Sequence, residues 1–176
     1  MYVLASQLKN LPIISLQTGE TITQIHSLII EMERLEIVAV KCVNMKEISD
    51  PILMVRSIRQ IASDCIIIDS EEDIGSAEDV VRLKEPLLAN YSPIGSSVIS
   101  HMQRPIGRVE DFTINSESLK LQKLYIRQPI WRSWLGSSLI VAREQILDVK
   151  PKVIVVREAI IENKLTLHKQ VPEPRP

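Results

Sequence analysis

RPIGRVEDFTINSESLKLQKLYI, residues 104–126, has the same apolar pattern as ETITQIHSLIIEMERLEIVAVKC, residues 20–42. Each apolar position in the later stretch lies 84 residues after its match, as in 106 − 22 = 84. The matched pairs are Ile22/Ile106, Ile25/Val109, Leu28/Phe112, Ile30/Ile114, Leu35/Leu119, Ile37/Leu121 and Val40/Leu124. Chance rarely produces so many matches at one offset in so short a window, so we interpret the stretches as copies of one structural unit.

The repeat continues downstream, where ILMVRSIRQIASDCIIIDS (52–70) corresponds to LIVAREQILDVKPKVIVVRE (139–158). Leu53 matches Leu139 at an offset of 86, and Cys65 matches Val153 at an offset of 88. The growing offset indicates small insertions in the loops of the second copy.

Each copy is predicted to consist of β-strands. EIVAVKC and LKLQKLYI are short runs of β-forming residues, and CIIID and VIVVR are continuous apolar runs typical of buried strands. Turn signals such as QTGE and NSES separate them at intervals of roughly ten residues, as in small barrels and sandwiches. MVRSIRQIA and AREQILDV, with apolar residues three apart, predict one helical turn rather than a strand. We therefore expect an all-β protein with two tandem small β-barrels, each of about six strands with a short helical turn before the last.

This pattern divides the chain into four parts. Barrel 1 is expected over 1–75, an acidic, helical linker over 76–90, barrel 2 over 91–162, and a proline-rich disordered tail over 163–176. The stretch from Asp69 to Asp79 holds six acids and no base, which is typical of a solvated linker. Ser76 is predicted to cap a short linker helix that Pro86 interrupts or ends.

The composition is that of an ordinary globular protein. The 176 residues carry a net charge of −1 and are 45% hydrophobic, so bulk charge favours neither nucleic acid nor an anionic membrane. No apolar run is long enough to span a bilayer, and the first residues lack the pattern of a secretory leader. We expect a cytoplasmic protein, with Cys42 and Cys65 as two buried small hydrophobic residues.

The second copy resembles the PRC-barrel domain through Pro105, Ile106, Gly107, Val109, Asp111, Phe112 and Ile114. The first keeps the apolar positions but has Thr23 where glycine is usual and Ser27 where an acid is usual. This family is named for the H subunit of photosynthetic reaction centres, and it also forms the C-terminal half of the ribosome maturation factor RimM. The resemblance covers about residues 3–70 and 90–162 and implies a tandem PRC-barrel protein.

Members of that family are generally binding modules without catalysis, with links to RNA processing, ribosome assembly, electron-transfer assemblies and archaeal cell division. This chain has no transmembrane helix like that of the reaction-centre subunit. It also has a second PRC-like unit in place of the distinct N-terminal barrel of the maturation factor. Both departures weaken the transfer of either specific role.

Sequence motifs for chemistry are missing. The five glycines form no phosphate-binding loop, and neither a nucleophile elbow nor a zinc-binding HExxH motif occurs. The three histidines and two cysteines have no spacing typical of metal ligands. We expect no catalytic residues, no cofactor, no metal site and no small-molecule substrate, and hence a protein that is not an enzyme.

One surface segment stands apart, YIRQPIWRSWLGSS, residues 125–138. It contains both tryptophans, Trp131 and Trp134, together with Arg127 and Arg132, and the matching segment VNMKEISDPI has no tryptophan. Three interpretations stay open, in the order in which the sequence favours them. The tryptophans plug the barrel end or the seam between barrels, they form a protein-binding hot spot, or they contact RNA or a membrane surface.

We take the chain as a non-catalytic PRC-barrel adaptor that binds a protein partner through Arg127, Trp131, Arg132 and Trp134. The alternative is a factor in RNA processing or ribosome assembly, by analogy with the maturation factor. Contact with a membrane surface is the weaker of the remaining expectations.

Overall fold

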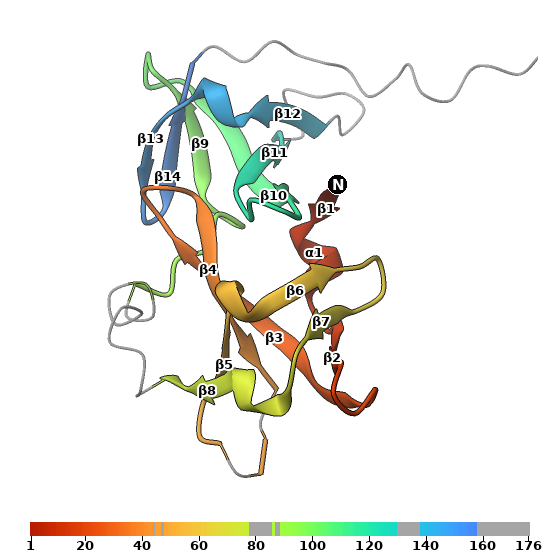
Figure 1. The fold of residues 1–176 in the computed structure, drawn as a ribbon. Coiled ribbons are helices and arrows are strands. Elements are labelled where there is room, and N and C mark those ends of the chain that lie inside the picture. Colours follow the sequence, from red (N-terminus) through yellow and green to blue (C-terminus); the bar gives the residue numbers. More distant parts are fainter. Residues whose placement is uncertain (44, 47, 78–85, 87–88, 130–137, 158–176) are drawn as a thin grey trace, which may run out of the picture.

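The computed structural model describes residues 1–43, 45, 46, 48–77, 86, 89–129 and 138–157, and its strands form two sheets (Figure 1). The first sheet has the order β6-β7-β2-β3-β4-β5-β8. Its strands are β2 (Pro12–Ser15), β3 (Thr21–Glu31), β4 (Glu36–Cys42), β5 (Pro51–Met54), β6 (Ile58–Ile61), β7 (Ile66–Ile68) and β8 (Ile74–Ser76). Two short 3₁₀ turns, η1 (Val55–Ser57) and η2 (Glu71–Asp73), connect strands of this sheet.

The second sheet has the order β12-β11-β10-β9-β14-β13, and β1 pairs with the far end of β10. Its strands are β1 (Tyr2–Leu4), β9 (Ser97–Ser100), β10 (Pro105–Asn115), β11 (Leu121–Arg127), β12 (Ser138–Ala142), β13 (Ile146–Lys150) and β14 (Val153–Val156). The 3₁₀ turn η6 (Arg143–Gln145) lies between β12 and β13.

Matched by position, the two sheets have the same order of six strands. The sequence β6-β7-β2-β3-β4-β5 corresponds to β13-β14-β9-β10-β11-β12. In both sheets the last of these strands along the chain, β7 or β14, pairs in parallel with the first, β2 or β9, while the other pairs are antiparallel. The curled sheets of Figure 1 confirm the all-β prediction. Closed barrels stay a prediction, because the pairing order of each sheet ends in two edge strands among the described residues.

The helical turns form where the sequence places them but are shorter than expected. Residues Ile58–Ile61 and Ile146–Lys150, expected to be helical, form β6 and β13 after the turns η1 and η6. Isoleucine and valine residues three apart fit one face of a helix, but both residue types are β-branched and favour strands. Here β6 pairs with β7 and β13 pairs with β14, so these residues form strands. In each repeat, therefore, two strands directly follow this turn: β6 and β7 after η1, and β13 and β14 after η6.

The apolar residues of the repeat form the core. Ile25, Leu53, Ile114, Leu124 and Ile126 are almost completely buried, and they belong to one hydrophobic cluster that includes residues of both sheets. Each fully buried Leu or Ile contributes about 1.5–3 kcal/mol through removal of apolar surface from water. A shared core of this kind stabilises the two sheets together.

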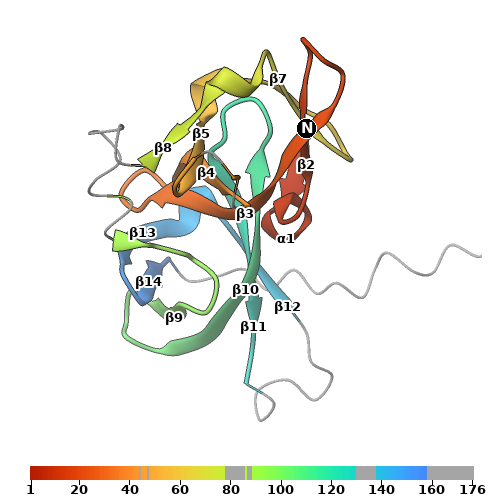
Figure 2. The same cartoon turned by 90° about the horizontal axis from the view of Figure 1, so that it is seen from below.

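The N-terminal segment packs on the second sheet, although it precedes the first one in the chain. β1 pairs with Thr113–Asn115 of β10, and the following helix α1 (Ala5–Leu8) lies beside the same strand (Figure 2). The Ser6 hydroxyl donates a 2.5 Å hydrogen bond to the Asp111 carboxylate, which fixes α1 in place. The domain boundary expected at residue 75 therefore does not separate the two sheets completely, because β1 lies before it and pairs with the second sheet.

The two long hairpins meet at their tips through reciprocal backbone hydrogen bonds. The N–H of Ile37 donates to the carbonyl of Leu119 (3.0 Å), and the N–H of Leu121 donates to the carbonyl of Leu35 (2.9 Å). The two bonds exchange under the repeat offset, since 121 − 37 = 84 and 119 − 35 = 84. Leu35 and Leu119 are both buried and both have positive φ, at 50° and 56°. We call this contact the hairpin seam.

Arg143 reinforces the hairpin seam from one side only. Its guanidinium donates to the carbonyls of Leu35 and Leu121 at 3.3 Å and to that of Arg34 at 2.5 Å. The matching position in the first copy is Val55 (143 − 88 = 55), which has no such group. The seam is thus reciprocal in its backbone and one-sided in its side chains.

Several sequence-based expectations about the connections fall mainly outside the described residues. Ser76 is the last residue of β8, and its hydroxyl donates to the carbonyl of Ser49, while its role as a helix cap stays a prediction. Most of the expected linker helix, at 78–85, 87 and 88, and the whole tail at 163–176 lie outside the described residues.

Replacing Arg143 tests the seam. We expect Arg143→Ala to lower the free energy of unfolding by about 2 kcal/mol, because three carbonyls lose a charged donor and two of these hydrogen bonds are partly buried. Arg56→Ala, at an exposed position of the corresponding turn η1, is the control and should change it by less than about 0.5 kcal/mol. Urea unfolding measures both, and equal effects would contradict a role of Arg143 in the seam.

Candidate functional site

Arg127 stands at the base of the predicted partner-binding segment. It is the last residue of β11, and its pairing with Ser138 of β12 is the last rung before the chain leaves the sheet. Trp131, Arg132 and Trp134 lie outside the described residues, so the structure places one of the four predicted site residues. The segment therefore connects the paired ends of β11 and β12, a position at which loops commonly carry binding residues.

The charge of Arg127 has a partner. Its guanidinium donates to the Glu110 carboxylate on the neighbouring strand β10, and both side chains are largely exposed. An exposed ion pair adds little to stability, about 0–1 kcal/mol. It does orient the Arg127 side chain along the sheet and reduces the net positive charge at the base of the segment.

Gly107 allows β10 to pass close to this base. A Cβ atom at Gly107 would lie 2.3 Å from the carbonyl oxygen of Arg127 and 2.8 Å from a side-chain carbon of Ile126. In the first copy the same two places hold Thr23 and Val43 (107 − 84 = 23 and 127 − 84 = 43), and the Thr23 hydroxyl donates to the Val43 carbonyl at 3.1 Å. The strands β10 and β11 are therefore closer together at Gly107 and Arg127 than β3 and the chain at Val43 are at the equivalent point of the first sheet.

This close approach makes Gly107 sensitive to substitution. We expect Gly107→Ala to lower the free energy of unfolding by about 2–3 kcal/mol, because the added methyl meets a backbone oxygen that a side-chain rotation cannot move. Gly75→Ala is a matched control in strand β8, since nothing lies within 4 Å of its Cβ position. Chemical denaturation separates the two, and a neutral Gly107→Ala would contradict the geometry.

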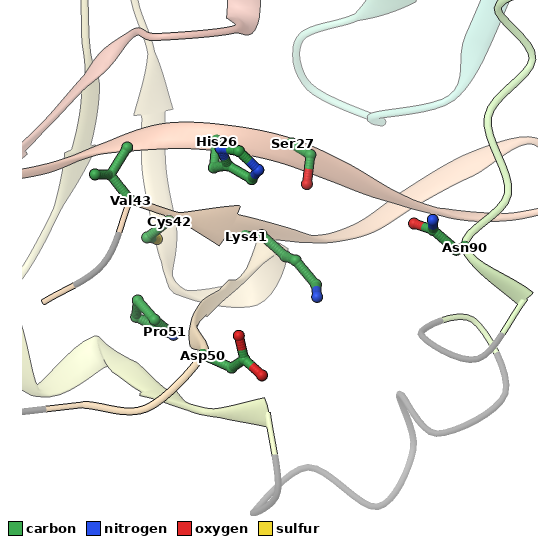
Figure 3. A pocket seen from close by; sticks show the side chains of 8 residues that line it. All are labelled: His26, Ser27, Lys41, Cys42, Val43, Asp50, Pro51 and Asn90. Carbon is green, nitrogen blue, oxygen red and sulfur yellow. The ribbon is translucent and has the colours of Figure 1, made fainter.

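A polar pocket of about 470 Å³ lies on the first sheet, the one that contains β3 and β4 (Figure 3). Its walls come from β3, the end of β4, the start of β5 and Asn90 in the segment before β9. They comprise His26, Ser27, Lys41, Cys42, Val43, Asp50, Pro51 and Asn90. His26 sits at a β-bulge where the pairing of β3 with β4 shifts between Ile25 and Ser27. Bulges re-aim side chains, and this one helps to place His26 at the pocket wall.

The Cys42 thiol in this pocket is poorly suited to act as a nucleophile. Cys42 is buried, and burial raises the pKa of its thiol to about 11, so the thiol stays protonated at neutral pH. A reactive cysteine needs a lowered pKa and a neighbouring base that takes its proton. Among the described residues, no group of three His, Cys, Asp or Glu side chains is arranged to hold a metal ion.

Sequence reasoning did not find this pocket. His26, Lys41 and Asp50 are separated along the chain and become neighbours only through the pairing of β3, β4 and β5. None belongs to a motif with fixed spacing, so the sequence contains no local signal for the pocket. Cys65 also differs from expectation, since it is only partly buried, whereas Cys42 is buried as expected.

The two thiols should differ in reactivity. We expect a thiol-reactive disulfide reagent at pH 8 to modify Cys65 in the folded protein and Cys42 only after unfolding, because Cys42 is buried whereas Cys65 is partly exposed, although the pKa of both thiols is raised. The raised folded-state pKa also means that Cys42 favours folding fully below pH 9 and loses this contribution as the pH rises through about 11. Cys65→Ser isolates Cys42, and rapid labelling of that folded variant would contradict the assignment.

Known proteins do not add to this description. No model of a known protein family matches the sequence, and no curated protein matches it either. Within the described part of the chain, no helix has the length and hydrophobicity to cross a bilayer.

Proposed function

We propose that the chain is a tandem PRC-barrel protein that acts as a non-catalytic adaptor in the cytoplasm. Its two copies form two small barrels that share one core, and the segment between β11 and β12 binds a protein partner. The observation that carries the proposal is the equal strand order of the two sheets combined with unequal loops at one equivalent position. A duplicated scaffold that keeps its strands and changes one loop is typical of a binding module.

The second sheet is the better candidate for the contact surface. Its β11–β12 loop carries two tryptophans and Arg132, residue types that dominate protein-binding hot spots, and the equivalent loop of the first sheet carries neither type. The paired rung Arg127–Ser138 and the close approach at Gly107 hold the base of this loop in place. A fixed base lowers the entropy that the loop loses on binding.

Charge at the base of the loop supports a protein partner over RNA or a ribosome. Binding to nucleic acid draws mainly on unpaired cations that neutralise phosphates. Arg127, the cation placed at this base, is paired with the Glu110 carboxylate, so its charge is balanced by an acid. A role in RNA processing or ribosome assembly is the alternative, and it is an outcome of the experiment below.

Replacing both tryptophans tests the adaptor function. We expect the Trp131→Ala/Trp134→Ala variant to keep its fold and to lose a crosslinked partner that survives nuclease treatment. Tyr2→Ala removes an exposed aromatic residue on another strand and should retain the partner. Crosslinking followed by purification, with and without nuclease, measures this, and circular dichroism with urea unfolding reports the fold.

Two results would overturn the proposal. A partner set that disappears with nuclease and consists of ribosomal components would establish the RNA-linked role instead. Loss of more than about 3 kcal/mol of stability in the double variant would show that the tryptophans are core residues.

A further inference from the structure

β5 and β12 occupy equivalent places in the two sheets, but only β5 has a strand on its outer side. Leu53 of β5 pairs with Val40 of β4, and Val141 of β12 pairs with Leu124 of β11. Because Val40 and Leu124 are equivalent positions of the repeat, Leu53 and Val141 are equivalent too (141 − 53 = 88), two residues beyond the sequence match to Leu139. On its other side β5 pairs with β8, whereas the second sheet ends at β12 among the described residues (Figure 1). The second copy therefore has an open edge where the first copy has a paired strand.

The open edge coincides with a difference in burial between the two copies. Ile52 of β5 is 2% exposed and packs in a small apolar cluster with Ile29 and Ala39. Ala77, directly after β8, packs against this cluster. The equivalent of Ile52 in β12 is Ile140 (140 − 52 = 88), and it is only partly buried. A strand along β12 would remove apolar surface of Ile140 from water and would give hydrogen-bond partners to the outward-facing backbone groups of this edge.

The described part of the chain ends close to β12. β14 ends at Val156, and the N–H of the next residue, Arg157, donates a 2.7 Å hydrogen bond to the carbonyl of Gln145. Gln145 is the last residue of η6, the turn that directly follows β12, and Val141 lies four residues before it (145 − 141 = 4). Four residues after Arg157 can likewise span up to about 14 Å. The chain from residue 161 onward can therefore run antiparallel to β12, starting beside Val141.

The sequence of this segment matches the sequence around β8. Glu71 and Ile74 of the first copy correspond to Glu158 and Ile161 at one offset (158 − 71 = 87 and 161 − 74 = 87). Ile74 is the first residue of β8 and is 3% exposed. Five residues separate it from the end of β7 (74 − 68 − 1 = 5), and four separate Ile161 from the end of β14 (161 − 156 − 1 = 4). Both connections are long enough to bring the chain to the same edge of its own sheet.

From these features we propose that residues 161–163 of this chain pair with the open edge of β12 as an antiparallel strand, the counterpart of β8. Transfer of the β5–β8 register predicts the pairs Val141/Ile161, Ile140/Glu162 and Leu139/Asn163. The strand ends near Ser138, where the proposed partner-binding segment rejoins the sheet. The pairing itself needs no other protein, so it stands apart from the adaptor function.

Hydrogen exchange of the whole chain, followed by mass spectrometry, tests this pairing. We expect the amides of residues 159–164 to exchange at least about tenfold more slowly than in an unstructured chain. In Ile161→Pro/Glu162→Pro the outward-facing amides of β12 should exchange about tenfold faster or more, while β4 keeps its protection. Neighbouring residues of a strand direct their N–H groups to opposite sides, so one of the two prolines removes a donor to β12. Leu167→Pro/His168→Pro is the matched control further along the chain and should leave exchange in β12 unchanged.

A pair of cysteines tests the register of the strand. In a Cys65→Ser background, Ile140→Cys/Glu162→Cys should form a disulfide within one chain under mild oxidation, because directly opposed residues of antiparallel strands have Cα atoms about 4.5–5.5 Å apart. The control Ile140→Cys/His168→Cys should form one at least about tenfold more slowly. Peptide mass spectrometry of dilute, oxidised protein measures both.

Several results would overturn the proposal. Exchange of residues 159–164 at the rate of an unstructured chain would show that the segment is unpaired, and unchanged exchange of β12 in the double-proline variant would show that it pairs elsewhere. Equal disulfide formation in the two cysteine pairs would contradict the register. A disulfide that forms only between chains, or protection that grows with protein concentration, would show that a second copy of the chain occupies the edge.

Discussion

The hydrogen bonds from Ile37 to Leu119 and from Leu121 to Leu35 hold the tips of two long hairpins together, and the arrangement of both sheets depends on them. Ile37 and Leu121 are equivalent positions of the two repeats, and so are Leu35 and Leu119. The two bonds are therefore the same contact made in both directions, as in an isologous interface between two identical subunits. Forming them requires positive φ at two buried leucines, a conformation that costs about 1–2 kcal/mol each for L-residues. Burial of both side chains in the shared core offsets that strain.

Much of the strand framework could be predicted from the sequence. The repeat of apolar residues predicted that Ile25 and Val109, or Val40 and Leu124, have equivalent environments, and all four are buried. The prediction worked because burial on a strand follows local alternation, which a sequence displays directly. It was wrong for Ile58–Ile61, where spacing of three indicated a helix and a neighbouring strand prevailed.

The arrangement between the copies could not be predicted in the same way. That β1 pairs with β10 across more than 100 residues depends on which edge of the second sheet is open, and no local pattern in Tyr2–Leu4 encodes this. The same holds for the polar pocket, whose residues come together only after the sheets form. Arg127, the one predicted partner-binding residue that the structure describes, is exposed, and its pairing with Glu110 follows from the register of β10 and β11.

The two sheets have the same strand order but unequal groups at equivalent positions. Two identical copies would present the same groups twice, and any cavity at their junction would have symmetric walls. Here Arg143 stands where the first copy has Val55, Gly107 where it has Thr23, and Phe112 where it has Leu28. Each change alters a contact at the hairpin seam, at the base of the tryptophan segment or in the cavity that Leu28 and Phe112 line. The buried positions that define the strands keep their apolar character. Because the two copies already stabilise each other through a common core, one of them can lose symmetry locally without loss of the fold. The two sheets thus share one core, while the groups at several equivalent positions differ.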